Sequence, residues 1–130
     1  VLETRQFKVK LNRFQAMEYD ALALTGSLER LRSTKAISDE DWARRMLGEV
    51  VPLWEGAGDL IYDAPVAHGS SAEPVKEALL DYLNSRRLGA ELRAEAIRDH
   101  DSAKQAWADS VNDHVEVQRQ AASKLVVRLD

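Results

Sequence analysis

The sequence predicts an all-α protein, an antiparallel up-down bundle of four helices, and three observations predict it. Apolar residues recur with a helical period along nearly the whole chain. Residues that interrupt helices are scarce, with 6 Gly and 3 Pro among 130 residues. The apolar stripes also divide into four segments of similar length joined by short links, which favours antiparallel neighbours. We expect a single domain over residues 1–130.

The bulk composition narrows the function classes. With 45% hydrophobic and 31% charged residues, the chain has the composition of an ordinary soluble globular protein. A net charge of −4 argues against a nucleic-acid binder. The chain has no Cys, which excludes disulfides and leaves the compartment open between the cytoplasm and an extracytoplasmic domain of a membrane-anchored protein. No apolar run approaches the roughly 18 residues of a membrane span.

The first helix is expected over residues 2–34. Its seam has one apolar row at seven-residue spacing, formed by Phe7, Phe14, Ala21 and Leu28, and a second row formed by Met17, Leu24 and Leu31. Such a seam suits helix packing at shallow crossing angles. Gly26 interrupts the pattern and costs about 1 kcal/mol in a helix interior, so a local bend there is the alternative to a straight helix.

The second helix is expected over residues 38–62. Ser38 is predicted as its N-cap, with the hydroxyl accepting a hydrogen bond from the amide of Asp41. The apolar stripe that follows consists of Trp42, Met46, Val50, Leu53, Ala57 and Ile61. Pro52 lies inside this stripe, lacks a backbone donor and crowds the carbonyl of Gly48. We therefore expect helix 2 to be kinked near Pro52, or to form two shorter helices.

A loop rich in turn-forming residues separates this segment from the third helix, which is expected over residues 73–99. Ser70 with Glu73 matches a capping box at its start, and Ser102 with Gln105 matches another at the start of a fourth helix over residues 102–129. Because no Gly or Pro separates these two segments, one continuous helix through residue 100 is the alternative. Trp107 lies on the fourth apolar stripe and, like Trp42 on the second, is expected in the core.

Polar residues occupy the centre of the third and fourth stripes, where apolar residues are expected. Arg86, Arg93 and His100 follow one another at seven-residue spacing, and His114 and Gln118 lie on the fourth stripe. If the two helices pair across a turn near residue 101, these side chains converge. The arrangement predicts a polar pocket between helices 3 and 4 for a small anionic ligand, because a guanidinium is the natural partner of a carboxylate.

Two structural alternatives exist for these arginines. Their long side chains can extend along apolar surface to the edge of the bundle and keep the charge in water. They can also form ion pairs with acids on other helices, such as Glu18 or Glu49.

Catalytic and metal-binding patterns are missing from the sequence. No two of the three histidines (His68, His100 and His114) have the i, i+4 spacing that places two imidazoles on one metal. There is no cysteine nucleophile and no serine in a Gly-x-Ser-x-Gly context. We therefore expect no enzyme, no cofactor and no metal.

Trp54 lies toward the edge of the second stripe, beside the kink expected at Pro52. An aromatic side chain in this position is a favourable anchor for a partner, and ordinary burial is the alternative. Together with the long heptad seam, these features favour a non-enzymatic helical interaction or sensory domain. Its partner would be another protein or a second copy of the chain.

One short motif carries a resemblance to known proteins. It is a hydrophobic pair, Pro, one residue, Trp and Glu, and it reads Val50, Val51, Pro52, Leu53, Trp54 and Glu55. With the following loop, a long arginine-rich helix and a last amphipathic helix, it resembles helical extramembrane regions of uncharacterised bacterial membrane-associated proteins. The resemblance covers about residues 37–125 and implies no catalytic residue. The chain begins at Val1 rather than Met, and we expect a processed protein or a fragment with an anchor flanking it.

Overall fold

The fold, taken from a computed structural model, is described for residues 2–129, and for the side chains of residues 4–129. Every regular element in this range is a helix: α1 (Leu2–Ser33), α2 (Asp39–Arg45), a π turn (Met46–Val50), α3 (Val51–Tyr62), α4 (Ala72–Asp99) and α5 (Ser102–Val126). Because α2, the π turn and α3 follow one another without a break, the chain forms four helical segments. The all-helical prediction is confirmed, while Val1 and Asp130 of the expected domain lie outside the described residues.

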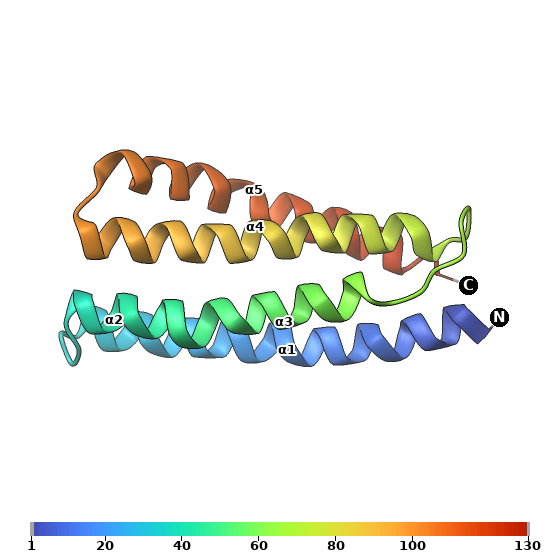
Figure 1. Cartoon of the computed structure of the whole chain (residues 1–130), viewed down its shortest axis with the longest axis horizontal. Helices are drawn as coiled ribbons and strands as arrows, with labels where there is room; N and C mark the ends of the chain where they lie inside the picture. The colour runs from blue at the N-terminus through green and yellow to red at the C-terminus, as the bar shows by residue number, and fades with distance from the viewer. Residues whose placement is uncertain (1, 130) are drawn as a thin grey trace.

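The four segments lie lengthwise side by side (Figure 1). The start of α1, the link between α3 and α4, and the end of α5 lie at the same end of the molecule. The backbone of α4 packs most extensively against α5 and also against α3, and α1 packs against α3. Within residues 2–129, the backbones of α1 and α5 do not approach each other closely along their lengths. We call the side between these two helices the open side of the bundle.

The core comes mainly from the first three segments. The predicted seam of α1 is buried, with Phe7 and Phe14 at 1% and 5% exposure and Ala21 and Leu28 fully buried. Trp42 is fully buried as well, as the sequence predicted. α1 continues as one helix through Gly26.

α5 contributes small residues instead. Its buried side chains are Ala108, Val115 and Ala122, at seven-residue spacing. The prediction that Trp107 lies in the core is wrong, because its side chain is 55% exposed. The buried row passes through the next residue, and one residue turns the side chain by about 100° around a helix with about 3.6 residues per turn.

α4 and α5 approach each other closely at Gly89. A Cβ atom on this residue would lie 2.1 Å from Oδ1 of Asn112. The absence of a side chain at Gly89 therefore lets the α5 side chain lie directly over the α4 backbone.

The helix caps partly follow the sequence. Oγ of Ser38 accepts a hydrogen bond from the Asp41 amide at 3.0 Å, as predicted. α4 and α5 are separate helices because His100 adopts a left-handed conformation, with φ at 53°. The capping box predicted at Ser102 is wrong, since Oδ1 of Asp101 accepts the amide of Lys104 at 2.9 Å. A carboxylate is an equally good N-cap acceptor, and it precedes Ser102 in extended backbone.

The capping box predicted at the start of α4 is also wrong. The Ser70 hydroxyl donates to the carbonyl of Ala67 at 2.6 Å. The Glu73 carboxylate accepts the amide of Gly69 at 3.0 Å, one residue before the expected donor. Both side chains therefore stabilise the loop turn rather than the first turn of the helix.

The π turn directly precedes Pro52. The amide of Val51 donates to the carbonyl of Met46, five residues back, instead of the usual four. Proline has no amide to donate, and its ring crowds the carbonyl of Gly48 in a regular helix. A wider turn just before proline accommodates the ring without ending the helical segment.

Candidate functional site: an arginine pocket on the open side of the bundle

Two of the residues predicted to bind a ligand line one pocket. Arg86 and Arg93 lie two turns apart on α4 and border a cavity of about 190 Å³. α1, the π turn, α3 and α5 supply the other walls, which include Leu22, Met46 and Trp54 as apolar residues and Thr25 and Asn112 as polar ones. We call this cavity the Arg86 pocket. It lies on the open side, where the backbones of α1 and α5 stay apart.

Arg86 is held by aromatic side chains rather than by an acid. Its Nε donates to the hydroxyl of Tyr82 at 3.1 Å. The guanidinium carbon lies 5.5 Å from the centre of the Trp54 ring and 5.3 Å from that of Tyr82, which are cation–π distances. Within residues 4–129, no ion pair joins Arg86 to a carboxylate. Arg86 is therefore a half-buried cation that forms no ion pair with the described side chains, although it interacts electrostatically with Glu116 of α5.

Arg93, by contrast, is paired. Its guanidinium forms a two-point ion pair with the Glu29 carboxylate of α1, in which Nη2 lies 3.2 Å from Oε2. The same guanidinium lies 4.8 Å from the centre of the Trp42 ring. Arg93 thus ties α4 to α1, in agreement with the alternative that these arginines pair with acids on other helices, although the acid is neither Glu18 nor Glu49.

The remaining predicted ligand-binding residues do not join this pocket. His100 ends α4 and is exposed. His114 is exposed on α5, where its Nδ1 lies 2.8 Å from the Ser110 carbonyl. Gln118 is half-buried, and its Oε1 is buried without a hydrogen-bond partner. The five residues therefore do not converge, and only Arg86 and Arg93 are brought together.

The two residues predicted to contact a partner also differ. Pro52 is exposed on the surface. Trp54 is only 3% exposed, and its ring packs edge-on against Tyr82, with centroids 6.3 Å apart. Trp54 is thus a wall of the Arg86 pocket in this conformation, in keeping with the ordinary burial weighed as the alternative.

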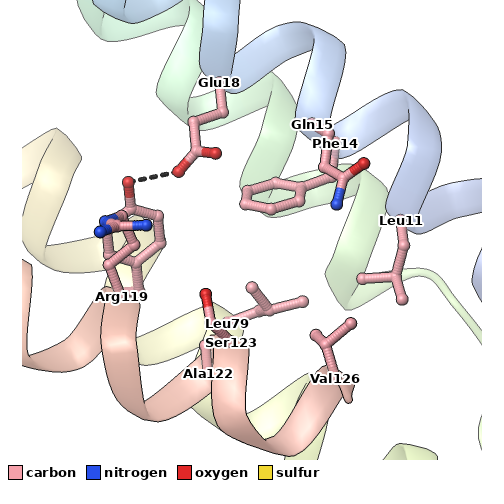
Figure 2. Close-up of a pocket in the computed structure, with 10 residues that line it drawn as sticks. Leu11, Phe14, Gln15, Glu18, Leu79, Arg119, Ala122, Ser123 and Val126 are labelled. Carbon is pink, nitrogen blue, oxygen red and sulfur yellow. Dashed lines mark hydrogen bonds between the residues drawn. The ribbon is translucent and has the colours of Figure 1, made fainter. Parts of the chain in front are cut away.

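A second cavity has Tyr82 in its wall but not Arg86. It has a volume of about 130 Å³, and α1, α4 and α5 line it. Figure 2 shows Glu18 at one end of this cavity and Leu11 and Val126 toward the other. We call it the Glu18 pocket. The Tyr82 hydroxyl donates to Oε2 of Glu18 at 2.5 Å (dashed line in Figure 2), so Arg86, Tyr82 and Glu18 form a hydrogen-bonded chain.

The electrostatics of this chain centre on Tyr82. Burial raises the pKa of the Tyr82 hydroxyl to about 12, and its hydrogen bond to Glu18 adds to the shift. The hydroxyl therefore remains a neutral donor toward Glu18 and an acceptor for Arg86 at physiological pH. At the rim, Arg119 pairs with Glu116 on its own helix, with Nε and Oε2 3.0 Å apart.

Sequence reasoning missed the roles of Glu18 and Tyr82. One signal was present, because Tyr82 and Arg86 are four residues apart and side chains at that spacing meet on a helix. The contact between Glu18 and Tyr82 joins residues 64 positions apart. Its formation depends on how α1 is placed along α4, which the sequence of a single chain does not display.

Two further observations concern metals and membranes. In the described part of the chain, no three His, Asp or Glu side chains are grouped so that they could hold a metal ion. None of the helices described for residues 2–129 is long and apolar enough to cross a bilayer.

Comparisons of the chain with protein-family models, with curated proteins and with solved structures gave no match.

Proposed function

We propose that this protein is a non-enzymatic sensory domain that binds a small carboxylate in the Arg86 pocket. The observation that carries the proposal is the state of Arg86, a half-buried guanidinium with aromatic neighbours and no acid paired to it among the side chains of residues 4–129. Charged side chains are rarely buried unless they are paired. A ligand carboxylate would supply the missing partner.

The walls of the pocket indicate the rest of the ligand. Leu22, Met46 and Trp54 offer apolar surface beside the guanidinium. The volume of about 190 Å³ is somewhat larger than an engineered cavity of about 150 Å³ that holds benzene. Thr25 and Asn112 add neutral hydrogen-bonding groups. The ligand that fits is a carboxylate whose apolar body is about the size of a benzene ring.

The architecture we infer for this role is the antiparallel up-down bundle expected from the sequence, with its second helix kinked near Pro52. The alignment of the four segments in Figure 1 and the π turn before Pro52 support it. Met46 belongs to that turn and also lines the Arg86 pocket. A ligand in the Arg86 pocket would therefore contact the second segment at its π turn.

The interaction role expected from the heptad seam has less support. The seam residues Phe7, Phe14, Ala21 and Leu28 are buried inside this chain and present no face to a partner. Self-association or binding of a protein partner stays a prediction. The exposed ring of Trp107 is an apolar group that such a partner could contact.

The test is a titration of the full chain with benzoate, followed by Trp fluorescence and by NMR shifts of Arg side chains. We expect saturable binding that Arg86→Gln weakens at least about tenfold, because a charge-assisted hydrogen bond contributes about 1.5–3 kcal/mol. The matched control is Arg87→Gln, since Arg87 is the next residue and already pairs with Glu91 at 2.9 Å. Equal affinity of benzoate for the wild type and Arg86→Gln would contradict the proposal.

A further inference from the structure

The Glu18 pocket contains the opposite kind of unpaired charge. The Glu18 carboxylate is half-buried, and its Oε2 accepts the Tyr82 hydroxyl. Within residues 4–129, no Lys, Arg or His forms an ion pair with it. Its Oε1 has no hydrogen bond from the described side chains. One carboxylate oxygen is therefore free to accept a donor from a ligand.

The rest of the lining is mainly apolar, with Gln15, Arg119 and Ser123 as its polar members besides Tyr82. Leu11 and Phe14 of α1, Leu79 of α4 and Val126 of α5 line it beyond the carboxylate. Figure 2 shows Glu18 at the end of the cavity away from Leu11 and Val126. The volume of about 130 Å³ is close to that of the engineered cavity of about 150 Å³ that binds benzene.

We infer that the Glu18 pocket binds a small organic ammonium, with the charged nitrogen on Glu18 and an apolar ring or short chain among Leu11, Phe14 and Val126. The ammonium donates to the free oxygen of Glu18 while Tyr82 holds the other. The apolar group fills space that the protein leaves between α1 and α5. A ligand of this kind satisfies both the unpaired charge and the apolar walls.

Arg119 lines the rim of the same pocket and is the protein's own competitor for Glu18. Glu116 holds its guanidinium with two hydrogen bonds, and this partner raises the pKa of Arg119 further above its usual range. Arg119 interacts electrostatically with Glu18 as well, but its hydrogen bonds go to Glu116 and it forms no ion pair with Glu18. Glu116→Gln removes the acid that retains Arg119, and we expect the released guanidinium to weaken ammonium binding.

The inference rests on Glu18 and not on Arg86, so it stands or falls separately from the proposed carboxylate site. The probes are benzylamine, benzyl alcohol and benzoate, titrated into the full chain at neutral pH by calorimetry and two-dimensional NMR. Benzylamine should bind with shifts at Leu11, Phe14 and Val126, and about tenfold more tightly than benzyl alcohol. Arg86→Gln should weaken benzoate binding and retain saturable benzylamine binding, because the Glu18 carboxylate that receives the ammonium is still present.

Two variants and one control make the test specific. Glu18→Gln should reduce the affinity for benzylamine to that for benzyl alcohol. Ser123→Leu, at a rim residue that is exposed, should fill the cavity and remove the binding of both. Glu77→Gln changes an exposed acid of α4 and should bind benzylamine like the wild type. Circular dichroism establishes that each variant is folded.

Three results would overturn the inference. The first is the absence of saturable benzylamine binding to the wild type. The second is equal benzylamine affinity in the wild type and Glu18→Gln, which would mean that the charge is not recognised. The third is unchanged binding in Ser123→Leu, which would place the amine outside the cavity.

Discussion

The interface of α1 with the second segment and the interface of α4 with α5 are built from different side chains. The first uses large residues, such as Phe7, Leu28 and Trp42, and buries them almost completely. The second uses small ones, including Gly89, Ala108 and Ala122, and leaves most of α5 exposed. Large side chains fill the space between helices and close it, whereas small ones bring two helices together without reaching a third.

The two interfaces therefore differ in how they stabilise the fold and in how they border the two pockets. The closed interface buries large apolar side chains such as Phe7, Leu28 and Trp42, and burial of apolar area is the dominant favourable term in folding. α5 approaches α4 closely but does not close the side toward α1. The Arg86 pocket and the Glu18 pocket both lie on that side and both include residues of α5. The two proposed binding sites therefore lie beside the interface that is built from small side chains.

Replacing one tryptophan in each half tests the comparison with the largest expected effect. Trp42→Ala removes a fully buried ring and should lower the free energy of unfolding by about 3–5 kcal/mol. Trp42 also lies under the guanidinium groups of Arg32 and Arg93, at 5.0 and 4.8 Å. Trp107→Ala removes a ring that is 55% exposed and should change stability by no more than about 0.5 kcal/mol. Urea unfolding followed by far-UV circular dichroism measures both, and similar losses would refute the division.

The closed half is also the half that the sequence predicted best. Seven-residue spacing of large apolar residues identifies a buried face directly, and Phe7, Phe14, Ala21 and Leu28 are all buried. The cap of α2, in the same half, followed local chemistry too, since Ser38 accepts the Asp41 amide as predicted. Both features depend on neighbours along one helix, so a single sequence contains the information.

The open half could not be predicted to the same degree. In α5 the buried row consists of Ala108, Val115 and Ala122, and alanines mark a face less clearly than large residues do. The periodic pattern placed Trp107 in the core because it could not distinguish two adjacent positions. Helical periodicity also says which face is buried but not which helix covers it. The gap between α1 and α5, and with it the Glu18–Tyr82 contact, follows from that unspecified choice.

Tyr82→Phe tests the hydrogen bond that joins α4 to Glu18 of α1. The substitution keeps the ring and removes the hydroxyl that bonds Glu18 and Arg86. We expect a loss of about 1.5–3 kcal/mol at neutral pH, because a hydrogen bond to a charged group is lost on each side. Tyr19→Phe, at a residue that is 73% exposed, is the matched control and should change stability little.

The pH dependence of the same variant gives a second readout. Burial, and then the hydrogen bond to Glu18, raise the pKa of Tyr82 to about 12, while an unfolded tyrosine titrates near about 10. The stabilisation by neutral Tyr82 is therefore fully present below about pH 10 and is lost as the pH rises toward 12. The stability gap between the wild type and Tyr82→Phe should narrow in this window. A gap that stays constant would show that the hydroxyl is not held as described.

The smallest effect concerns the start of α5, the helix with the fewest neighbours. Asp101→Ala removes the acceptor for the Lys104 amide and should cost about 1 kcal/mol. Ser102→Ala is the matched control, since Ser102 is the first residue of α5 and not its cap, and it should cost at most a few tenths of that. A larger loss for Ser102→Ala would restore the capping box that the sequence suggested.

Amide hydrogen exchange shows which helices lose stability in these variants. Because α5 packs chiefly against α4, its amides should open locally without unfolding the core. Asp101→Ala should therefore speed exchange in the first turns of α5 and leave the amides of α1 beside Phe14 and Leu28 unchanged. Ser38→Ala, which removes the cap of α2 in the closed half, should instead speed exchange throughout the molecule, because α2 is packed around the buried Trp42. If both variants affected α1 equally, α5 would unfold together with the core, and the binding surface would be as stable as the rest of the bundle.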